Sequence, residues 1–298
     1  MGYRFDGRVA IVTGAGRGIG RAYARLLGEL GAKVVVNDLG GSTDGVGTDP
    51  LPAQQVADEI RDAGGTAIPN VADVSSIAGG EALVGEALAE FGRVDIVINN
   101  AGTVRWGGLP EVDLANIEAH LAVHTKGSFN VIRAAWPHLL ERDYGRVVVT
   151  GSSGMFGLPD NLGYATAKAA LLGMAKSLSV SAGQHDIKIN VIAPNAFTRM
   201  ASRQRGPVPA QMEPELVAPM AAFLAHEACP VSGEVYLAGA GRFARIFVAA
   251  TDGYLHPDAA TPSIDDVAKN WETINDEAGY YVPSSLMDWA GHYLAHRS

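Results

Sequence analysis

The chain has 298 residues, of which 47% are hydrophobic and 18% charged, and its formal net charge is −9. This composition predicts a globular protein with a substantial core, and the acidic balance argues against nucleic-acid and anionic-membrane partners. The single cysteine, Cys229, excludes an internal disulfide and a cysteine metal site, so we expect no metal. With no apolar signal segment and no run long enough to cross a bilayer, we expect a cytoplasmic protein.

Short apolar strands alternate with helical segments along the chain. Strands are predicted at 8–13, 33–38, 66–71, 94–100, 145–152, 187–193 and 233–239, and helices at about 20–31, 53–63, 76–91, 113–142, from 162 onward and at 215–228. This order predicts an α/β fold, a Rossmann-type doubly wound parallel sheet covered on both faces. We expect one domain at 1–240 and a helical C-terminal extension at 241–298 packed on it, because so short and polar a segment cannot hold a core alone.

A glycine-rich turn follows the first predicted strand. In TGAGRGIG, residues 13–20, the glycines Gly14, Gly18 and Gly20 frame the turn into the first helix. Glycine lets the backbone approach a diphosphate closely, and a helix start offers free N–H groups and a positive dipole end. Glycine clusters also form turns that bind nothing, but this one lies where a dinucleotide site needs it. We expect a dinucleotide-binding loop that includes Arg17 and Ile19.

An acid ends the second predicted strand. A carboxylate at Asp38 can accept hydrogen bonds from both adenosine ribose hydroxyls and repel a 2′-phosphate. The alternative is that Asp38 is only a turn residue before LGGSTDG. Arg17 could favour a 2′-phosphate, but Asp38 is expected to lie closer to that position. The sequence therefore predicts NAD, not NADP, as the cofactor.

Tyr164 and Lys168 are four residues apart in a predicted helix, so their side chains share one face. A phenol that acts near neutral pH must lose about 3 pKa units, which is roughly 4 kcal/mol. One ammonium ~4 Å away supplies about 4 kcal/mol at an effective dielectric of about 20, before desolvation opposes it. An oxidised nicotinamide ring would add a second positive charge. The spacing alone is more typical of an exposed tyrosine and a solvated lysine, but together with the dinucleotide loop upstream the pair predicts a proton-transfer device.

These motifs occur in the order typical of one family. The G-x-x-x-G-x-G spacing of residues 14–20, NNAG at 99–102 and YATAK at 164–168 together resemble the short-chain dehydrogenase/reductases over roughly residues 5–240. The resemblance implies a catalytic serine at Ser152, with Ser153 as a possible substitute because the segment before Tyr164 is one residue shorter than usual. It also implies cofactor contacts from the loop glycines, Tyr164 and Lys168, and from Asp38, Asp73, Val74, Asn100, Ala101, Gly102, Pro194 and Thr198.

One departure from the family pattern lies in VHTKGSFN. His124 stands where the family usually has an asparagine, which helps to hold a water leading from the catalytic lysine to solvent. A histidine can also donate and accept hydrogen bonds, and it titrates near ~6.5, so a relay could persist at this position. A core histidine bonded to the backbone is an equal alternative, and we leave both open.

Longer stretches narrow the resemblance. VVVNDLGG, VHTKGSF, IAPNAFTRM and AGAGRFARI are similar to the dehydrogenase part of peroxisomal multifunctional enzymes of type 2 and to stand-alone bacterial relatives. The resemblance implies NAD-dependent oxidation of a (3R)-3-hydroxyacyl-CoA in fatty-acid or steroid side-chain breakdown, by a homodimer or homotetramer. Candidate ligands for the CoA phosphates are Arg105, Arg199, Arg203 and Arg205, each of which is as readily a solvated surface residue.

Two other hypotheses stay open. The chain could oxidise hydroxysteroids or other free secondary alcohols, or it could be a catalytically silent NAD-binding regulatory protein on the same fold. The complete set of Ser152, Tyr164 and Lys168 argues against the silent alternative. In either enzymatic reading the expected partner is a small molecule, an acyl-CoA or a steroid-like alcohol.

Overall fold

The computed structural model describes residues 2–201, 212–257 and 261–295. Eight strands form one sheet in the order β3-β2-β1-β4-β5-β6-β7-β8. The strands are β1 (Val9–Thr13), β2 (Lys33–Asn37), β3 (Thr66–Asn70), β4 (Ile96–Asn99), β5 (Tyr144–Thr150), β6 (Asp186–Pro194), β7 (Val235–Gly239) and β8 (Arg242–Ile246). Pairing from β3 across to β7 is parallel throughout. The predicted doubly wound parallel sheet is confirmed.

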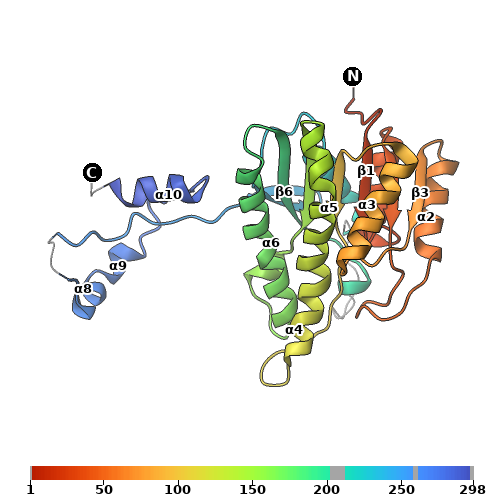
Figure 1. Cartoon of the computed structure of the whole chain (residues 1–298). Helices are drawn as coiled ribbons and strands as arrows, with labels where there is room; N and C mark the ends of the chain where they lie inside the picture. Colours follow the sequence, from red (N-terminus) through yellow and green to blue (C-terminus); the bar gives the residue numbers. More distant parts are fainter. Residues whose placement is uncertain (1, 202–211, 258–260, 296–298) are drawn as a thin grey trace. The chain divides into compact units, whose positions relative to one another are not determined.

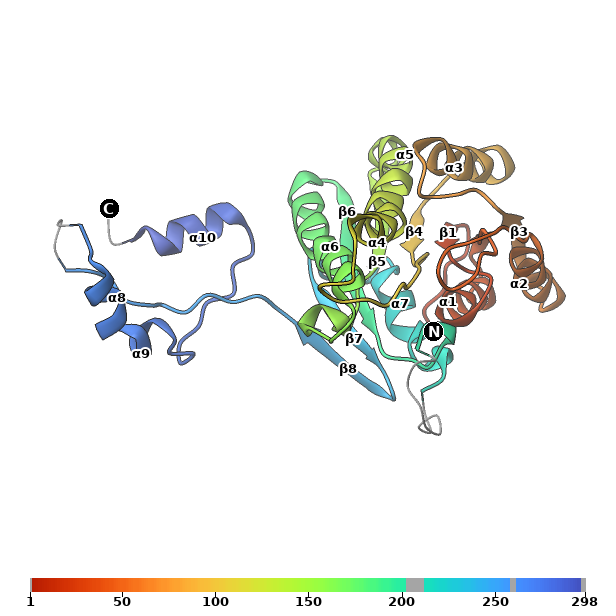
Figure 2. The ribbon, with the colours of Figure 1, turned by 90° about the horizontal axis from the view of Figure 1, so that it is seen from below.

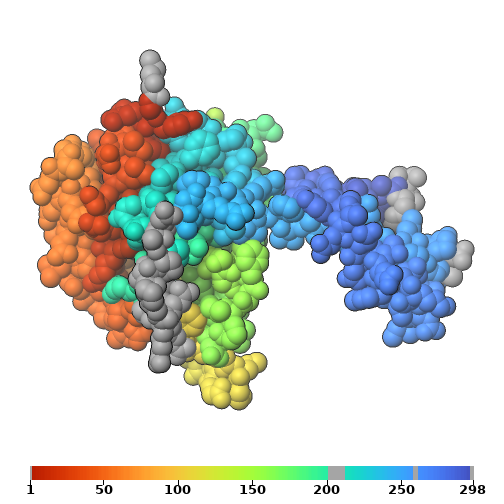
Figure 3. Space-filling view, turned by 180° about the vertical axis from the view of Figure 1, so that it is seen from behind, coloured from red at the N-terminus to blue at the C-terminus, as the bar shows by residue number. Residues whose placement is uncertain are grey.

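Helices cover both faces of the sheet (Figures 1 and 2). One layer consists of α1 (Gly18–Glu29), α2 (Leu51–Asp62) and α7 (Ala218–Leu224). The opposite layer consists of α3 (Ile77–Phe91), α4 (Leu114–His120), α5 (Gly127–Glu141) and α6 (Leu162–Ser181). On the face turned away in Figure 1, the surface is formed by α1 and α2 (red to orange) together with α7 and the last strands (cyan to blue) (Figure 3).

The central strands are apolar because helices cover them on both sides. All five residues of β1 and all four of β4 are buried. Chain order reverses between these two neighbours, since β2 and β3 continue outward from β1 and β5 to β7 continue outward from β4. At such a switch point the loops after adjacent strands diverge and leave a crevice at the carboxyl ends of the strands. The candidate site lies there.

Three features of the fold differ from the sequence-based expectation. The helix expected at 113–142 contains one wider turn, a π-helical segment at Leu121–Lys126 between α4 and α5. The helix expected at 215–228 is shorter, because residues 214–216 form a separate 3₁₀ turn before α7. An eighth strand, β8, follows β7 through Ala240 and Gly241, both at positive φ (51° and 71°), as a tight two-residue hairpin requires.

Contacts divide the chain into two units, Met1–Arg245 and Ile246–Ser298. The second unit contains α8 (Ile264–Lys269), α9 (Trp271–Ile274) and α10 (Leu286–Tyr293). Ser263 begins α8 with reciprocal hydrogen bonds to Asp266, the capping arrangement that satisfies free backbone donors. The packing of the extension on residues 1–240 stays a prediction. In the described ranges no helix is both long enough and apolar enough to span a membrane.

Candidate active site

The turn between β1 and α1 is held against the loop that follows β4. Gly14 and Gly18 adopt positive φ angles of 61° and 53°, a region that favours glycine. A Cβ on Gly20 would lie 2.1 Å from the Gly14 carbonyl oxygen, and one on Gly14 would lie 2.7 Å from Ala101 Cα. Side chains at these two positions are therefore excluded by the backbone itself. Because Gly14 and Gly20 have no side chains, the turn can pack closely and α1 can begin at the crevice.

Polar side chains fasten the same two loops together. The Asn100 amide Nδ2 donates to the carbonyl oxygens of Thr13 and Gly14, both at 3.1 Å. Thr13 Oγ1 accepts from the backbone N–H groups of Asn100 and Ala101, both at 3.0 Å. Sequence reasoning missed Thr13, although a hydroxyl residue at the end of a buried strand beside NNAG was a usable signal. The contacts fix the shape of the glycine turn.

Asp38 lies at the same edge, immediately after β2. Its Oδ2 accepts from the Gly16 N–H at 2.8 Å and its Oδ1 from the Gly40 N–H at 2.7 Å. Each carboxylate oxygen has a second lone pair, so hydrogen bonds to the backbone leave capacity for a ligand. Asp38 is thus a turn-stabilising residue and also an acceptor that faces the crevice. The turn-residue and the ribose-acceptor interpretations of Asp38 are therefore compatible.

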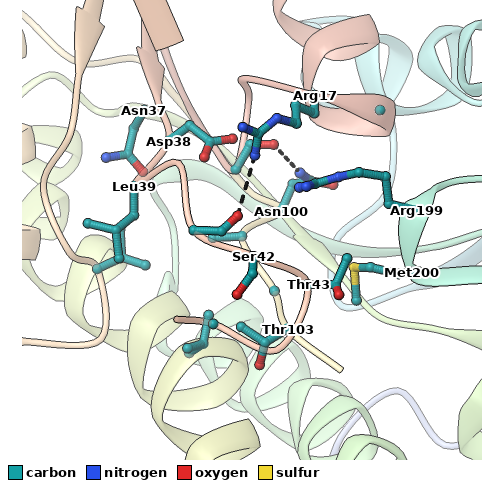
Figure 4. A pocket seen from close by; sticks show the side chains of 18 of the residues that line it. Arg17, Asn37, Asp38, Leu39, Ser42, Thr43, Asn100, Thr103, Arg199 and Met200 are labelled. Carbon is teal, nitrogen blue, oxygen red and sulfur yellow. Dashed lines mark hydrogen bonds between the residues drawn. The ribbon is translucent and has the colours of Figure 1, made fainter. Parts of the chain in front are cut away.

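The crevice at these loops holds a cavity of about 270 Å³ (Figure 4). Of the residues expected to contact a cofactor, it is lined by Gly14, Arg17, Gly18, Ile19, Asp38, Asp73, Val74, Asn100, Ala101, Gly102 and Thr198. Gly20 is buried in α1 and does not line the cavity. Sequence reasoning missed the loop after β2, which adds Leu39, Gly41, Ser42, Thr43 and Gly45 to the lining.

Two arginines lie near Asp38. Arg17 Nη1 donates to the carbonyl oxygens of Gly40 and Gly41 at 3.5 and 3.4 Å. In Figure 4 the Arg17 guanidinium lies between Asp38 and Arg199. Partial burial and the Arg17 charge lower the pKa of Arg199, and Asp38 opposes them. Arg199, a candidate CoA ligand from its sequence, lines the same cavity as Asp38.

The other CoA candidates have different positions. Arg105 Nε donates to the Asp44 carbonyl oxygen at 2.8 Å, on the loop after β2. Arg203 and Arg205 lie outside the described residues.

A second cavity, of about 640 Å³, adjoins the first through shared lining residues, among them Ile19, Asn100 and Thr198. Ser152, Tyr164, Lys168, His124 and Pro194 all line it. Ser152 lies close enough to the Tyr164 hydroxyl to lower its pKa, and Ser152 Oγ accepts from the Gly154 N–H at 3.0 Å. Ser153 is exposed, and it is not among the groups that shift the pKa of Tyr164. The geometry favours Ser152 over Ser153 as the partner of Tyr164.

Lys168 is 3% exposed, and its Nζ donates to the Thr150 carbonyl oxygen at 2.5 Å. Nζ lies 5.7 Å from the centroid of the Tyr164 ring. Burial lowers the pKa of Lys168 to about 7. Burial also raises the pKa of Tyr164, with the Ser152 hydrogen bond opposing it. Desolvation, which the sequence-based estimate left out, therefore opposes the effect of the ammonium at both groups, and Lys168 is only partly charged near neutral pH.

His124 is fully buried beside Tyr164, within the π-helical segment. Its Nε2 lies 2.8 Å from the Thr103 carbonyl oxygen, and its ring meets the Tyr164 ring edge-on with centroids 5.2 Å apart. Burial, aided by the Lys168 charge, lowers the pKa of His124 well below its usual value. Nδ1 is buried without a hydrogen-bond partner. The contact of Nε2 with the backbone thus matches the core-histidine alternative. Nδ1 has no partner, and His124 lines the second cavity, so the relay alternative also stays open.

A dinucleotide-type glycine turn and a Ser–Tyr–Lys set in adjoining cavities of a doubly wound sheet define an oxidoreductase. The model of the short chain dehydrogenase family matches residues 8–207, and the chain belongs to that family.

Known proteins agree with this assignment. A short-chain type dehydrogenase/reductase of Mycobacterium tuberculosis is 42% identical over 274 residues, 91% of this chain and 95% of that protein. The structure of full-length peroxisomal multifunctional enzyme type 2 from Drosophila melanogaster superposes with a TM-score of 0.82 at 30% identity over 98% of this chain, which spans 50% of that one. A 7α-hydroxysteroid dehydrogenase complexed with NADH and 7-oxo glycochenodeoxycholic acid gives a TM-score of 0.70 at 28% identity, over 80% of this chain and 95% of that one.

Proposed function

We propose that this dehydrogenase oxidises a (3R)-3-hydroxyacyl-CoA to the 3-ketoacyl-CoA, with NAD as hydride acceptor. The observation that carries the proposal is the gathering of Ser152, Tyr164 and Lys168 in a cavity that continues into a glycine-lined crevice. The choice of substrate is supported by the sequence resemblance to type 2 multifunctional enzymes and by the similarity to the Drosophila enzyme.

The crevice fits a dinucleotide. Gly18 begins α1 at positive φ, where free N–H groups and the helix dipole favour a diphosphate. The nearest atom to a Cβ built on Gly18 is Thr198 Cγ2 at 3.5 Å, so the backbone there is open to a ligand. When bound, the oxidised nicotinamide would accept a hydride from C3 of the substrate. Asp38 supports NAD over NADP because its charge disfavours a 2′-phosphate.

The proposed roles of the side chains follow from their positions. Ser152 would hydrogen-bond the substrate oxygen, and Tyr164 would take the hydroxyl proton as the C3–H electron pair leaves as hydride. The C–O bond becomes a carbonyl, so each turnover yields one ketone, one NADH and one proton. Lys168, with its pKa of about 7, can exchange a proton behind Tyr164.

The enzyme is proposed to be a cytoplasmic homodimer or homotetramer. Phe129 on α5 and Val180 on α6 are exposed apolar residues, 48% and 59% accessible, on the long helices through which we expect subunits to pair.

A substrate panel tests the proposal. Straight-chain and steroid-derived 3-hydroxyacyl-CoAs, the matching free alcohols and bile-acid hydroxysteroids would each be incubated with NAD, and NADH absorbance followed. We expect a higher kcat/KM for the CoA thioesters. A higher kcat/KM for free hydroxysteroids would favour the second candidate function, which the similarity to the 7α-hydroxysteroid dehydrogenase supports. No NADH with any alcohol would favour a silent nucleotide-binding protein.

Asp38→Asn is expected to relax the cofactor preference. Removing the carboxylate leaves Arg17 and Arg199 beside the adenosine end of the cavity with no compensating charge from Asp38. The ratio of kcat/KM for NADP to that for NAD should rise by about 100-fold, because one unit charge at close range contributes on the order of a few kcal/mol. The control is Asp73→Asn, which removes a carboxylate from the same cavity and should leave the ratio nearly unchanged. An unchanged ratio in Asp38→Asn would contradict the role given to Asp38.

A further inference from the structure

Asn161 occupies the position immediately before α6, the helix that carries Tyr164 and Lys168. Asparagine is favoured there because its side chain can accept a hydrogen bond from the free N–H groups of the first helical turn. Asn161 makes no such bond. By contrast, Ser76, Asp113 and Ser285 all cap their helices through the side chain. Helix capping therefore does not explain the orientation of the Asn161 carboxamide.

Asn161 lies beside Ser152 and Tyr164 in the lining of the catalytic cavity. Asn161 is 4% exposed, lines the same cavity as Ser152 and Tyr164, and its Oδ1 is buried without a partner. A Cβ built on Gly154 would lie 3.2 Å from Ser152 Oγ, 3.4 Å from Asn161 Nδ2 and 3.4 Å from Tyr164 Cε1. The side chains of Ser152, Asn161 and Tyr164 thus lie around Gly154, which has no side chain to separate them.

The backbone on either side of Asn161 is fixed. The Gly107 N–H donates to the Asp160 carbonyl oxygen at 2.8 Å, and the Ala165 N–H donates to the Asn161 carbonyl oxygen at 2.9 Å. Asp160 itself adopts a φ of 57°, which is uncommon for a residue with a side chain. Such backbone strain tends to be found at functional sites.

A buried carboxamide oxygen without a partner is unfavourable unless a ligand or water meets it. His124 Nδ1 and Thr150 Oγ1 are also buried without partners and line the same cavity. The cavity is therefore equipped for a ligand with more than one polar atom. A substrate with a single hydroxyl would use only the Ser152 and Tyr164 end.

We propose that Asn161 binds the second oxygen of the substrate, the carbonyl oxygen of the thioester two carbons from the reacting hydroxyl. This inference rests on the proposed function. With the C3 hydroxyl at Ser152 and Tyr164, the C1 carbonyl of a 3-hydroxyacyl thioester would lie only a few ångströms away, a separation that Asn161 can bridge because all three side chains lie around Gly154. A carboxamide can turn to present its N–H to a carbonyl oxygen. Asn161 would make the enzyme selective for alcohols that carry this neighbouring carbonyl, because a site built around a hydrogen bond rejects ligands that lack it.

The test compares two substrates that differ in one oxygen: a 3-hydroxyacyl-CoA thioester and the thioether analogue in which a methylene replaces the C1 carbonyl. For the wild type we expect kcat/KM to favour the thioester by at least about tenfold, the value of one well-made hydrogen bond. In Asn161→Leu, which is similar in size but cannot hydrogen-bond, the ratio should fall toward one. Asn161→Gln keeps the carboxamide and should recover part of the selectivity.

A structural role of Asn161 would give a different result. A parallel loss of kcat/KM for both substrates in Asn161→Leu, with the ratio unchanged, would overturn the inference. Ser76→Ala serves as a matched control, since Ser76 caps α3 through its side chain but lines neither cavity, and the variant should lower Tm without altering the ratio. If Asn161→Leu fails to fold, Asn161→Ser, which retains a good capping residue, answers the same question. A wild type that oxidises neither substrate would refute the proposed function, a result distinct from an unchanged ratio.

Discussion

Tyr164→Phe is expected to lower kcat by about 10³-fold, since a positioned proton-transfer group contributes about 10²–10⁴-fold. The substitution removes only the hydroxyl. The edge-on packing of the ring against His120 and His124, with centroids 6.2 and 5.2 Å away, would be kept. Binding of NADH should therefore change less than twofold. Steady-state NADH formation gives the loss of activity, and quenching of protein fluorescence gives the nucleotide affinity.

Tyr144→Phe is the matched control. Tyr144 is buried in β5, and its ring packs against the guanidinium groups of Arg8 and Arg146 at 3.8 and 4.5 Å from the ring centroid, contacts that phenylalanine also makes. Its activity should stay near that of the wild type. If Tyr164→Phe kept more than a tenth of wild-type kcat, proton transfer would have to be assigned to another group that lines the cavity, such as His124. Loss of NADH binding would instead point to a structural defect.

The sheet could be predicted because its signal is local. VAIVT and KVVVN each contain a continuous run of apolar residues, a pattern typical of a strand that is covered on both faces. In the structure β1 and β2 pair in register along their full length. The glycine turn could be predicted because its residues are contiguous. The four-residue spacing of Tyr164 and Lys168 fixes their common face whatever surrounds them.

Other features depend on contacts that the sequence does not encode locally. The π-helical turn at Leu121–Lys126 has no periodicity of its own, and β8 reads as the start of a polar extension. Thr13 joins the site through contacts with Asn100, 87 positions away. The sequence also cannot show that the Asn161 side chain makes no capping hydrogen bond, because this depends on the hydrogen bonds formed in the folded structure. Desolvation of Lys168 likewise follows from what packs around it, so the sequence-based charge argument could not include its magnitude.

Lys168→Met is the second large expected effect: the variant should lose activity and yet gain stability at pH 7. Burial depresses the pKa of Lys168 from 10.5 in the unfolded chain to about 7 in the folded one. Between these values the unfolded chain binds a proton that the folded protein lacks. The unfolding free energy of the wild type should therefore rise with pH across this window, by at most about 1.4 kcal/mol per pH unit.

Methionine is close in size to the lysine stem and carries no charge, so the variant lacks this pH dependence. Its advantage over the wild type should be largest at pH 7 and below, where folding must either bury the charge or release the proton. The advantage should shrink as the pH rises toward 10. Loss of the hydrogen bond from Nζ to the Thr150 carbonyl oxygen offsets part of the gain, by about 1 kcal/mol. Urea unfolding at pH 7, 8 and 9 measures the difference directly.

Lys176→Met controls for removal of a positive charge from the same helix. Lys176 is 40% exposed and pairs with Glu234 at 3.5 Å, an exposed ion pair that contributes little. Its effect on unfolding should be small and nearly constant over the same pH values. A Lys168→Met protein that is less stable than the wild type at pH 7, with a parallel pH dependence, would show that burial does not control the charge of this lysine. Proton exchange behind Tyr164 at neutral pH would then require another group, because a permanently charged ammonium can release no proton there.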